Sequence, residues 1–267
     1  MTGRARTAAA DVERYYDEWT HRYLEVGENL IEACRPASTE ELLRYYIKSI
    51  GLQPGQHLLD AGCGVCGPAA FFARHLPVTI DALTISQVQV DLARQVLADA
   101  GVSDRVSVRK GNYDDLPNLY SPATFDGVLF LEALGHAERP EHVIRNAWTV
   151  LKPGGFLYIK DFFARETDDP EGRRRVASVT RNIDDSYAYN TLDLHQVLRA
   201  ARKVGFRIDA IKSPGFEIDI RIRAQFEERN GISIFGGLPE FVPTDWLELR
   251  FLKDEGYNAN FSACLAG

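Results

Sequence analysis

Residues 60–67, Asp-Ala-Gly-Cys-Gly-Val-Cys-Gly, combine an acidic side chain with closely spaced glycines. They follow a short apolar run and precede a segment with helical spacing, which predicts a turn between a strand and a helix. Gly62 and Gly64 would let a ligand lie against the backbone, and the next helix would offer it free N–H groups. The Asp60 carboxylate would accept hydrogen bonds from a cationic or N–H-bearing ligand and would oppose a pyrophosphate. The segment therefore predicts a small-molecule site.

The same turn contains Cys63 and Cys66 at a spacing found in redox and metal sites. No second pair of cysteines and no clustered histidines accompany them in the sequence, and small thiols also suit a crowded turn. We therefore expect no metal site. A nicotinamide-dependent oxidoreductase is an alternative, because such sites use an acid about 20 residues beyond the turn and Asp81 lies near that spacing.

Alternating strands and helices must position this turn. Strands are predicted at residues 57–60, 78–83, 106–110, 125–131, 156–160 and 206–211, and helices at 68–75, 87–100, 141–151 and 192–204. This order predicts an α/β fold with a Rossmann-like, doubly wound, mainly parallel sheet. Apolar alternation over 257–265 predicts a seventh, antiparallel edge strand. Residues 9–50 have helical spacing and predict an N-terminal lid, while 161–190 and 215–250 predict cap insertions, the second with helical character.

The composition narrows the class of protein. The chain has 267 residues, 45% of them hydrophobic, and a net charge of −7. These values exclude disorder as the main state, and the missing basic face argues against a nucleic-acid partner. No apolar run approaches the roughly 20 residues that span a membrane, and we see no signal peptide. We expect a cytoplasmic protein, and the composition leaves a homo-oligomer open.

The motifs resemble those of a known family. Residues 60–70 resemble the first motif of class I S-adenosylmethionine-dependent methyltransferases and are most similar to the sterol C-methyltransferase form, D-x-G-C-G-V-G-G-P-A. Cys66 departs from that form, which has glycine there. Residues 83–89, Leu-Thr-Ile-Ser-Gln-Val-Gln, resemble a segment of cyclopropane-type and prenyl C-methyltransferases. Residues 131–137 resemble the I-E-A-x-x-H segment of sterol C-methyltransferases. A fainter likeness to geranyl diphosphate methyltransferases lies around 179–187.

The resemblance implies S-adenosyl-L-methionine as cofactor and one methyltransferase domain over residues 1–267. That domain would consist of a lid (1–50), a cofactor-binding core (51–165) and a part with the cap insertions and the last two strands (166–267). Most class I enzymes carry an acid at the position of Thr84, so here Thr84 and Gln89 would hold the ribose by hydrogen bonds. The implied cofactor-binding residues are Tyr16, Tyr23, Asp60, Gly62, Cys63, Gly64, Thr84, Gln89, Asn112, Tyr113 and Leu131.

Two further residues could take part in the reaction. Glu132 follows the fourth strand, so we expect it near the transferred methyl group, as a base or a stabiliser of positive charge. Its alternative role is to bond only to backbone or lid. His136 would orient Glu132 or share a proton with it, or would only cap the next helix.

The acceptor is predicted to be a small hydrophobic molecule, because aromatic residues are dense in the lid and cap. We expect Phe162 and Tyr187 to contact it, and Arg181 to hold an anionic group if it carries one. The resemblance implies C-methylation of an isoprenoid or prenyl group through a carbocation in secondary metabolism. Alternatives are O- or N-methylation of a secondary metabolite, an NAD(P)-dependent oxidoreductase, and a non-catalytic cofactor-binding protein.

Overall fold

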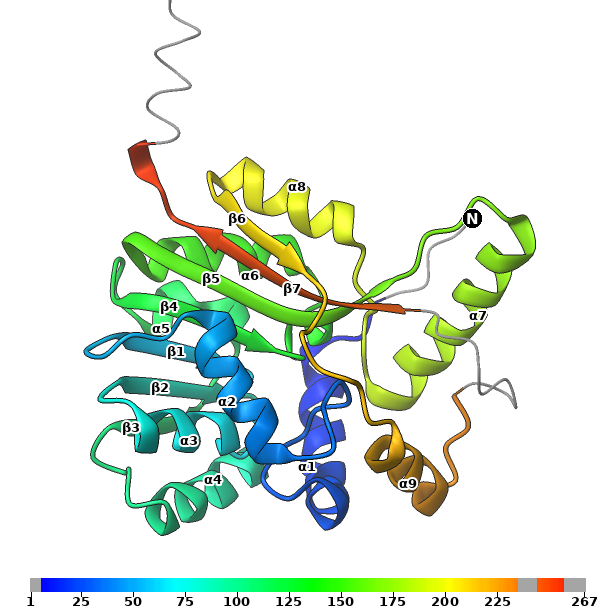
Figure 1. Ribbon diagram of the computed structural model, residues 1–267, viewed down its shortest axis with the longest axis horizontal. Helices are drawn as coiled ribbons and strands as arrows, with labels where there is room; N and C mark the ends of the chain where they lie inside the picture. Colours follow the sequence, from blue (N-terminus) through cyan, green and yellow to red (C-terminus); the bar gives the residue numbers. More distant parts are fainter. Residues whose placement is uncertain (1–5, 235–243, 257–267) are drawn as a thin grey trace, which may run out of the picture.

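A seven-stranded sheet forms the centre of the computed structural model, which describes residues 6–234 and 244–256 (Figure 1). Its strand order is β3-β2-β1-β4-β5-β7-β6, and β7 runs antiparallel to both of its neighbours. The predicted mainly parallel sheet with an antiparallel last strand is therefore confirmed. The strands are β1 (His57–Ala61), β2 (Thr79–Thr84), β3 (Val106–Lys110), β4 (Phe125–Leu131), β5 (Leu151–Ala164), β6 (Arg207–Lys212) and β7 (Thr244–Leu252).

Helices cover both faces of the sheet because successive strand residues point to opposite sides. Leu58 and Tyr158 belong to one buried cluster, while their neighbours Leu59 and Leu157 belong to the other. The first face is covered by α2 (Thr39–Ile50), α3 (Gly67–His75) and α4 (Gln87–Asp99). The second is covered by α5 (Leu116–Leu119), α6 (Pro140–Val150) and α8 (Leu194–Val204) (Figure 1).

Local chemistry fixes the ends of these helices. Ser38 and Ser86 cap α2 and α4, since each side chain accepts a hydrogen bond from a backbone N–H in the first turn. Gly51 ends α2 in the left-handed conformation, with φ 76°. Gly51 and Ser86 stand at boundaries that the sequence predicted, whereas the boundary at Ser38 was not predicted.

Three further helices gather beside the sheet: α1 (Ala9–Gly27), α7 (Pro170–Tyr187) and α9 (Arg221–Asn230) (Figure 1). Asp17 attaches α1 to the start of α4 by accepting a 2.5 Å hydrogen bond from the Ser86 hydroxyl. Tyr23 of α1 stacks on Phe226 of α9 with ring centroids 4.2 Å apart. No helix in residues 6–234 or 244–256 is long and apolar enough to cross a membrane.

The structure corrects some of the expected boundaries. Residues 28–38 interrupt the expected N-terminal helical segment and connect α1 to α2. The strand expected at 156–160 is longer and spans 151–164. The helical expectation for 215–250 holds for α9 but is wrong for residues 244–250, which belong to β7 and pair with residues 158–164 of β5. The strand predicted at 257–265 lies outside the described residues.

Candidate active site

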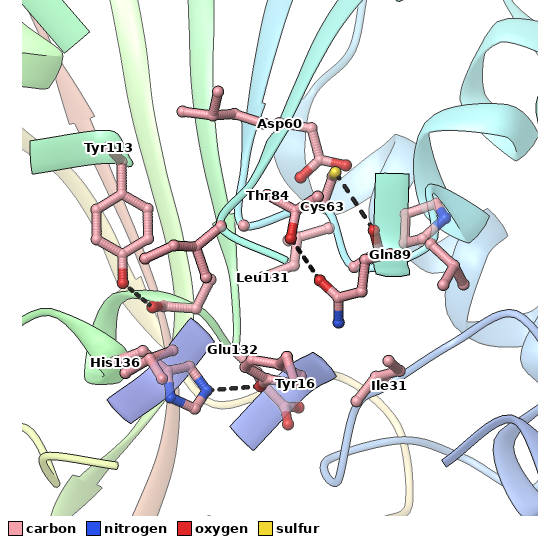
Figure 2. Close-up of a pocket in the computed structure, with 18 of the residues that line it drawn as sticks. Tyr16, Ile31, Asp60, Cys63, Thr84, Gln89, Tyr113, Leu131, Glu132 and His136 are labelled. Carbon is pink, nitrogen blue, oxygen red and sulfur yellow. Dashed lines mark hydrogen bonds between the residues drawn. The ribbon is translucent and has the colours of Figure 1, made fainter. Parts of the chain in front are cut away.

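A cavity of about 840 Å³ opens at the carboxyl ends of β1, β2 and β4 (Figure 2). This is the edge where open α/β sheets bind ligands. It is lined by all but one of the residues predicted to bind cofactor: Tyr16, Asp60, Gly62, Cys63, Gly64, Thr84, Gln89, Asn112, Tyr113 and Leu131. Tyr23, the exception, lines a neighbouring cavity instead.

The glycine-rich turn is built for close approach. Gly62 has φ 94°, and a Cβ there would lie 2.5 Å from Cβ of Ala133, so only glycine fits. The N–H groups of Gly62 and Cys63 both donate to the carbonyl of Leu83, which fixes the turn against the end of β2. Cys66 has a left-handed φ of 65°, the conformation that glycine adopts most easily, at the position where the sterol form has glycine.

The cysteines of this turn are buried free thiols. Within the described ranges, no group of three or more His, Cys, Asp and Glu side chains could hold a metal ion. Desolvation and the neighbouring Cys66 raise the pKa of Cys63 well above its ordinary value. The Cys63 thiol therefore remains protonated near neutral pH and packs as a small apolar group.

Asp60 is one of the acidic residues that line the cavity. It is 2% exposed, and its Oδ2 atom has no hydrogen-bond partner within residues 6–234 and 244–256. Burial, and secondly the charge of Glu32, raise the pKa of Asp60 to about 7. A buried carboxylate oxygen without a partner is unfavourable, so the site fits a ligand that brings a cation or N–H donors to Asp60.

Polar contacts order the rest of the cavity wall. The Thr84 hydroxyl donates a 2.5 Å hydrogen bond to Oε1 of Gln89, and the Gln89 amide nitrogen points away from it (Figure 2). Asn112 begins a short 3₁₀ turn by accepting a bond from the N–H of Asp114. The Tyr113 hydroxyl donates to the carbonyl of Ala133 at 3.1 Å. These bonds hold the side chains before any ligand binds.

A second cavity, of about 1510 Å³, adjoins the first and is mostly apolar. Its walls come from α1, α7, α9 and the adjoining ends of β5 and β7, and include Tyr23, Phe162, Ile183, Tyr187, Tyr189, Phe226, Ile234 and Trp246. The residues common to both cavities are Tyr16, Leu30, Ile31, Glu32, Glu132 and His136. The two cavities therefore meet at the carboxyl end of β4.

The residues predicted to contact the acceptor divide between this cavity and the surface. Phe162 and Tyr187 line the second cavity. Arg181 is exposed and lines neither cavity, so the structure contradicts its predicted place at the acceptor. The reason is helical spacing: α7 buries Val179 and Ile183, and a residue midway between them points the opposite way.

His136 and Tyr16 form a hydrogen-bonded pair at the junction (Figure 2). Nδ1 of His136 lies 2.9 Å from the carbonyl oxygen of Ala188, which can only accept, so Nδ1 carries the proton. Nε2 therefore accepts from the Tyr16 hydroxyl at 2.7 Å. Burial lowers the pKa of His136 to about 4, so the ring is neutral at pH 7. It presents a basic nitrogen at the junction.

Both carboxylate oxygens of Glu132 are hydrogen-bonded to groups of the protein, whereas a general base needs an oxygen that can reach the acceptor. Its Oε1 accepts bonds from Lys160 Nζ at 2.5 Å and from the N–H of Cys34 at 2.9 Å. Its Oε2 accepts from the N–H of Ala33 at 2.7 Å. Both oxygens are thus engaged by the lysine and by segment 28–38. The bonds to segment 28–38 are those of the alternative role that the sequence left open, whereas the bond to Lys160 was not expected. Within the described residues, no hydrogen bond joins Glu132 to His136.

Sequence reasoning missed Lys160 and Glu32. Lys160 is fully buried in β5 and bonds to Glu32 at 2.7 Å as well as to Glu132. Burial lowers the pKa of Lys160, but Glu132 and Glu32 raise it above its ordinary value, so the lysine stays charged. The available signal was a lone lysine after the apolar run Phe156–Ile159 of a central strand, because such a cation needs buried carboxylate partners.

The comparisons with known proteins agree with this geometry. Residues 59–159 match the model of a family described as "Methyltransferase domain". This chain contains a class I S-adenosylmethionine-dependent methyltransferase domain. The cofactor of the methyltransferase is S-adenosyl-L-methionine.

The relatives of the methyltransferase include enzymes that act on different acceptor atoms. It is 27% identical to the O-methyltransferase resE of Aspergillus sclerotiorum, over 93% of this chain and 95% of resE. It is 34% identical to 24-methylenesterol C-methyltransferase 2 of Oryza sativa subsp. japonica, over 58% of this chain and 42% of the rice protein. The methyltransferase thus spans nearly all of resE but less than half of the plant sterol enzyme.

Solved structures share the fold of the methyltransferase. The [4+2]-cyclase SpnF matches with a TM-score of 0.75 and 22% identity, covering 94% of this chain and 98% of SpnF. Geranyl diphosphate C-methyltransferase of Streptomyces coelicolor A3(2), solved with Mg²⁺, geranyl diphosphate and S-adenosyl-L-homocysteine, matches with a TM-score of 0.68 and 14% identity. That match covers 92% of this chain and 97% of the Streptomyces enzyme.

Proposed function

We propose that this methyltransferase transfers the methyl group to a small apolar acceptor, at a carbon of an isoprenoid or prenyl group in secondary metabolism. The observation that supports this most directly is that the cavity at the glycine-rich turn adjoins the aromatic-walled chamber and shares Tyr16 and His136 with it. When bound, the cofactor supplies an electrophilic methyl group. The protein therefore has mainly to align two reactants and exclude water.

The first cavity has groups that suit each part of the cofactor. The unpartnered Asp60 oxygen suits a cationic amine. Thr84 and Gln89 would bond to the ribose hydroxyls, and Asn112 and Tyr113 would flank the adenine. Tyr23 would then belong to the acceptor chamber rather than to the cofactor site.

The second cavity suits an alkene acceptor. An alkene attacks the methyl group with its π electrons and is left as a carbocation, which then loses a proton. Aromatic faces stabilise such a cation, and Tyr23, Phe162, Phe226 and Trp246 line this chamber. The neutral His136 would accept the proton at Nε2, because Nδ1 is bonded to Ala188. The sterol and geranyl diphosphate C-methyltransferase relatives support this proposal.

Heteroatom methylation is the second candidate, and a specific observation favours it. The His136 ring presents an unprotonated nitrogen toward the Tyr16 hydroxyl, and the same nitrogen could remove a proton from an acceptor O–H or N–H group. One relative that matches along nearly the whole chain, resE, is an O-methyltransferase by name.

A labelling experiment separates the two candidates. The protein is incubated with ¹³C-methyl-labelled cofactor and a panel of prenylated, terpenoid and phenolic acceptors, and the label is located by NMR. A label bonded to carbon would support the first candidate, and a label on oxygen or nitrogen would replace it with the second. Gly62→Val, which blocks the turn, is the control that should give no label.

Other expectations from the sequence remain proposals. These are the one-domain layout with lid (1–50), core (51–165) and cap (166–267), a cytoplasmic location, a homo-oligomer, and the lack of a nucleic-acid partner.

A further inference from the structure

Glu32 presents an unpartnered oxygen at the junction of the two cavities. Its side chain is 3% exposed, and it lines both cavities. Oε2 accepts from the Tyr46 hydroxyl and from Lys160 Nζ, the latter at 2.7 Å. Oε1 has no hydrogen-bond partner in the described part of the chain. Half of this carboxylate is thus anchored to the protein, and the other half is left for a ligand.

The wall of the first cavity carries more negative than positive charge. Its acidic residues are Glu32, Asp60, Asp114 and Glu132, and its described lining residues include no lysine or arginine. Lys160, behind the wall, is shared between Glu32 and Glu132. Burial raises the pKa of Glu32 above its ordinary value, although Lys160 opposes the change. A ligand that brings positive charge to this wall offsets the unfavourable burial of these carboxylates.

Two unpartnered oxygens mark two different places in the cavity. Asp60 is the last residue but one of β1, beside the glycine-rich turn, and lines only the first cavity. Glu32 lies where the first cavity meets the acceptor chamber. A methyl group that is to reach the acceptor must pass this junction, so the sulfonium that carries it belongs near Glu32. The amine end of the cofactor then belongs near Asp60.

We propose that Glu32 makes the site selective for the charged, methyl-bearing cofactor over its demethylated product. Methyl transfer breaks the bond between the sulfonium sulfur and its methyl carbon, and the electron pair of that bond stays on sulfur. The sulfur becomes a neutral thioether, so the positive charge opposite Glu32 is lost, whereas the amine near Asp60 is unchanged. The inference depends on the proposed function, because it uses the direction in which the methyl group travels.

Binding measurements test this without an acceptor. Isothermal calorimetry gives the Kd of S-adenosylmethionine and of S-adenosylhomocysteine for the wild-type protein and for Glu32→Gln. We expect Glu32→Gln to raise the Kd of S-adenosylmethionine by about 10-fold, the effect of one nearby opposite charge. The Kd of S-adenosylhomocysteine should rise by less than about 3-fold. An equal rise in Kd for both ligands, or no rise for either, would overturn the proposal.

Two matched variants separate charge from structure. Tyr46→Phe removes a partner of Glu32 but keeps its charge, and Tyr46 lines neither cavity, so the ratio of the two Kd values should stay at the wild-type level. Asp60→Asn should raise the Kd of both ligands by the same factor, because both carry the amine. A changed ratio in Tyr46→Phe would show that packing, not charge, sets the selectivity.

The wild-type protein offers a second measurement in case Glu32→Gln does not fold. Calorimetry in buffers of different ionisation enthalpy counts the protons released on binding. The sulfonium should release more protons than the thioether, because only the sulfonium brings a positive charge to Glu32, whereas the amine faces Asp60 in both ligands. Equal proton release would overturn the inference alone, whereas failure of the wild type to bind either ligand would also remove the proposed function.

Discussion

The hydroxyl of Tyr16 and Nε2 of His136 lie 2.7 Å apart, where the cofactor cavity meets the acceptor chamber. One residue comes from α1 and the other from the turn that follows β4. The pair therefore exists only when α1 is docked against the sheet. Docking of α1 both covers the site and orients its basic nitrogen.

Replacing His136 by Gln should lower turnover by about 10²- to 10³-fold, as expected for loss of a positioned base. Cofactor affinity should change less than about 3-fold, because the contacts of the glycine-rich turn remain. Single-turnover transfer from labelled cofactor measures the first quantity and calorimetry the second. Tyr16→Phe, which leaves Nε2 in place, should be the milder variant. Undiminished transfer by His136→Gln would reduce the residue to a structural role.

Glu132→Gln tests the role of the carboxylate. The sequence alone predicts a turnover loss of about 10²-fold or more, if Glu132 acts in the chemistry. The structure instead engages both oxygens with Lys160 and two backbone N–H groups. We now expect a stability loss of about 1.5–3 kcal/mol, typical of hydrogen bonds to charged groups, and a turnover within about 10-fold of wild type. Urea unfolding and kcat below the unfolding transition measure both effects. A folded variant with a hundredfold defect would restore the original interpretation.

Gly62→Val should abolish cofactor binding, because its side chain would meet Ala133 and its backbone has φ 94°. Gly62→Ala should show the same clash on a smaller scale, with a Cβ 2.5 Å from that of Ala133. Adding Ala133→Gly removes the obstructing methyl group but not the backbone strain, so the double variant should recover part of the affinity. Calorimetry measures the affinity of each variant for the cofactor, and thermal unfolding measures its stability. Full binding by Gly62→Val would mean that the ligand does not use this turn.

Asp60 should make both folding and cofactor binding depend on pH. Its pKa is about 7 in the folded protein, against 3.8 ordinarily. The folded state therefore keeps a proton that the unfolded state loses, and this group lowers stability as pH rises through that window, with no further change above it. Asp60→Asn should thus be stabilising, and more so at pH 8 than at pH 5.

Cofactor affinity should show the opposite trend with pH. Ionised Asp60 attracts the amine, so the affinity for S-adenosylmethionine should rise from pH 6 to 8, by at most about 10-fold per pH unit. Asp60→Asn should lose the part of this pH dependence that comes from Asp60. Asp161, whose pKa burial raises to about 7, and His136, whose pKa is lowered to about 4, titrate in both proteins. The difference between wild type and variant therefore isolates Asp60.

The core of the fold was predictable because its information is local. Strands β3 and β4 have the predicted bounds, and glycine or proline stands beside most of the other boundaries. Within β7, Leu247, Leu249 and Phe251 alternate with charged residues, but the apolar residues Trp246 and Leu252 on either side break this short pattern, and the strand was missed. Only pairing with β5 decides that this segment is a strand.

The site was partly predictable for the same reason. Motif residues such as Gly62 and Thr84 lie next to each other because two adjacent strands end there. Lys160 and Glu32, in contrast, are 128 positions apart, and no sequence period connects them. Which face of α7 would turn inward was also open, and the structure directs Arg181 to solvent.

Residues 28–38 form a wall common to both cavities, through Leu30, Ile31 and Glu32. The carbonyl of Asn29 occupies the space that a side chain on Gly67 would need, and Ile31 lies beside Gly64. Segment 28–38 thus closes both cavities on this side. A movement of segment 28–38 that releases S-adenosylhomocysteine also opens the acceptor chamber to the methylated product. We therefore expect the release of the two products to be kinetically coupled.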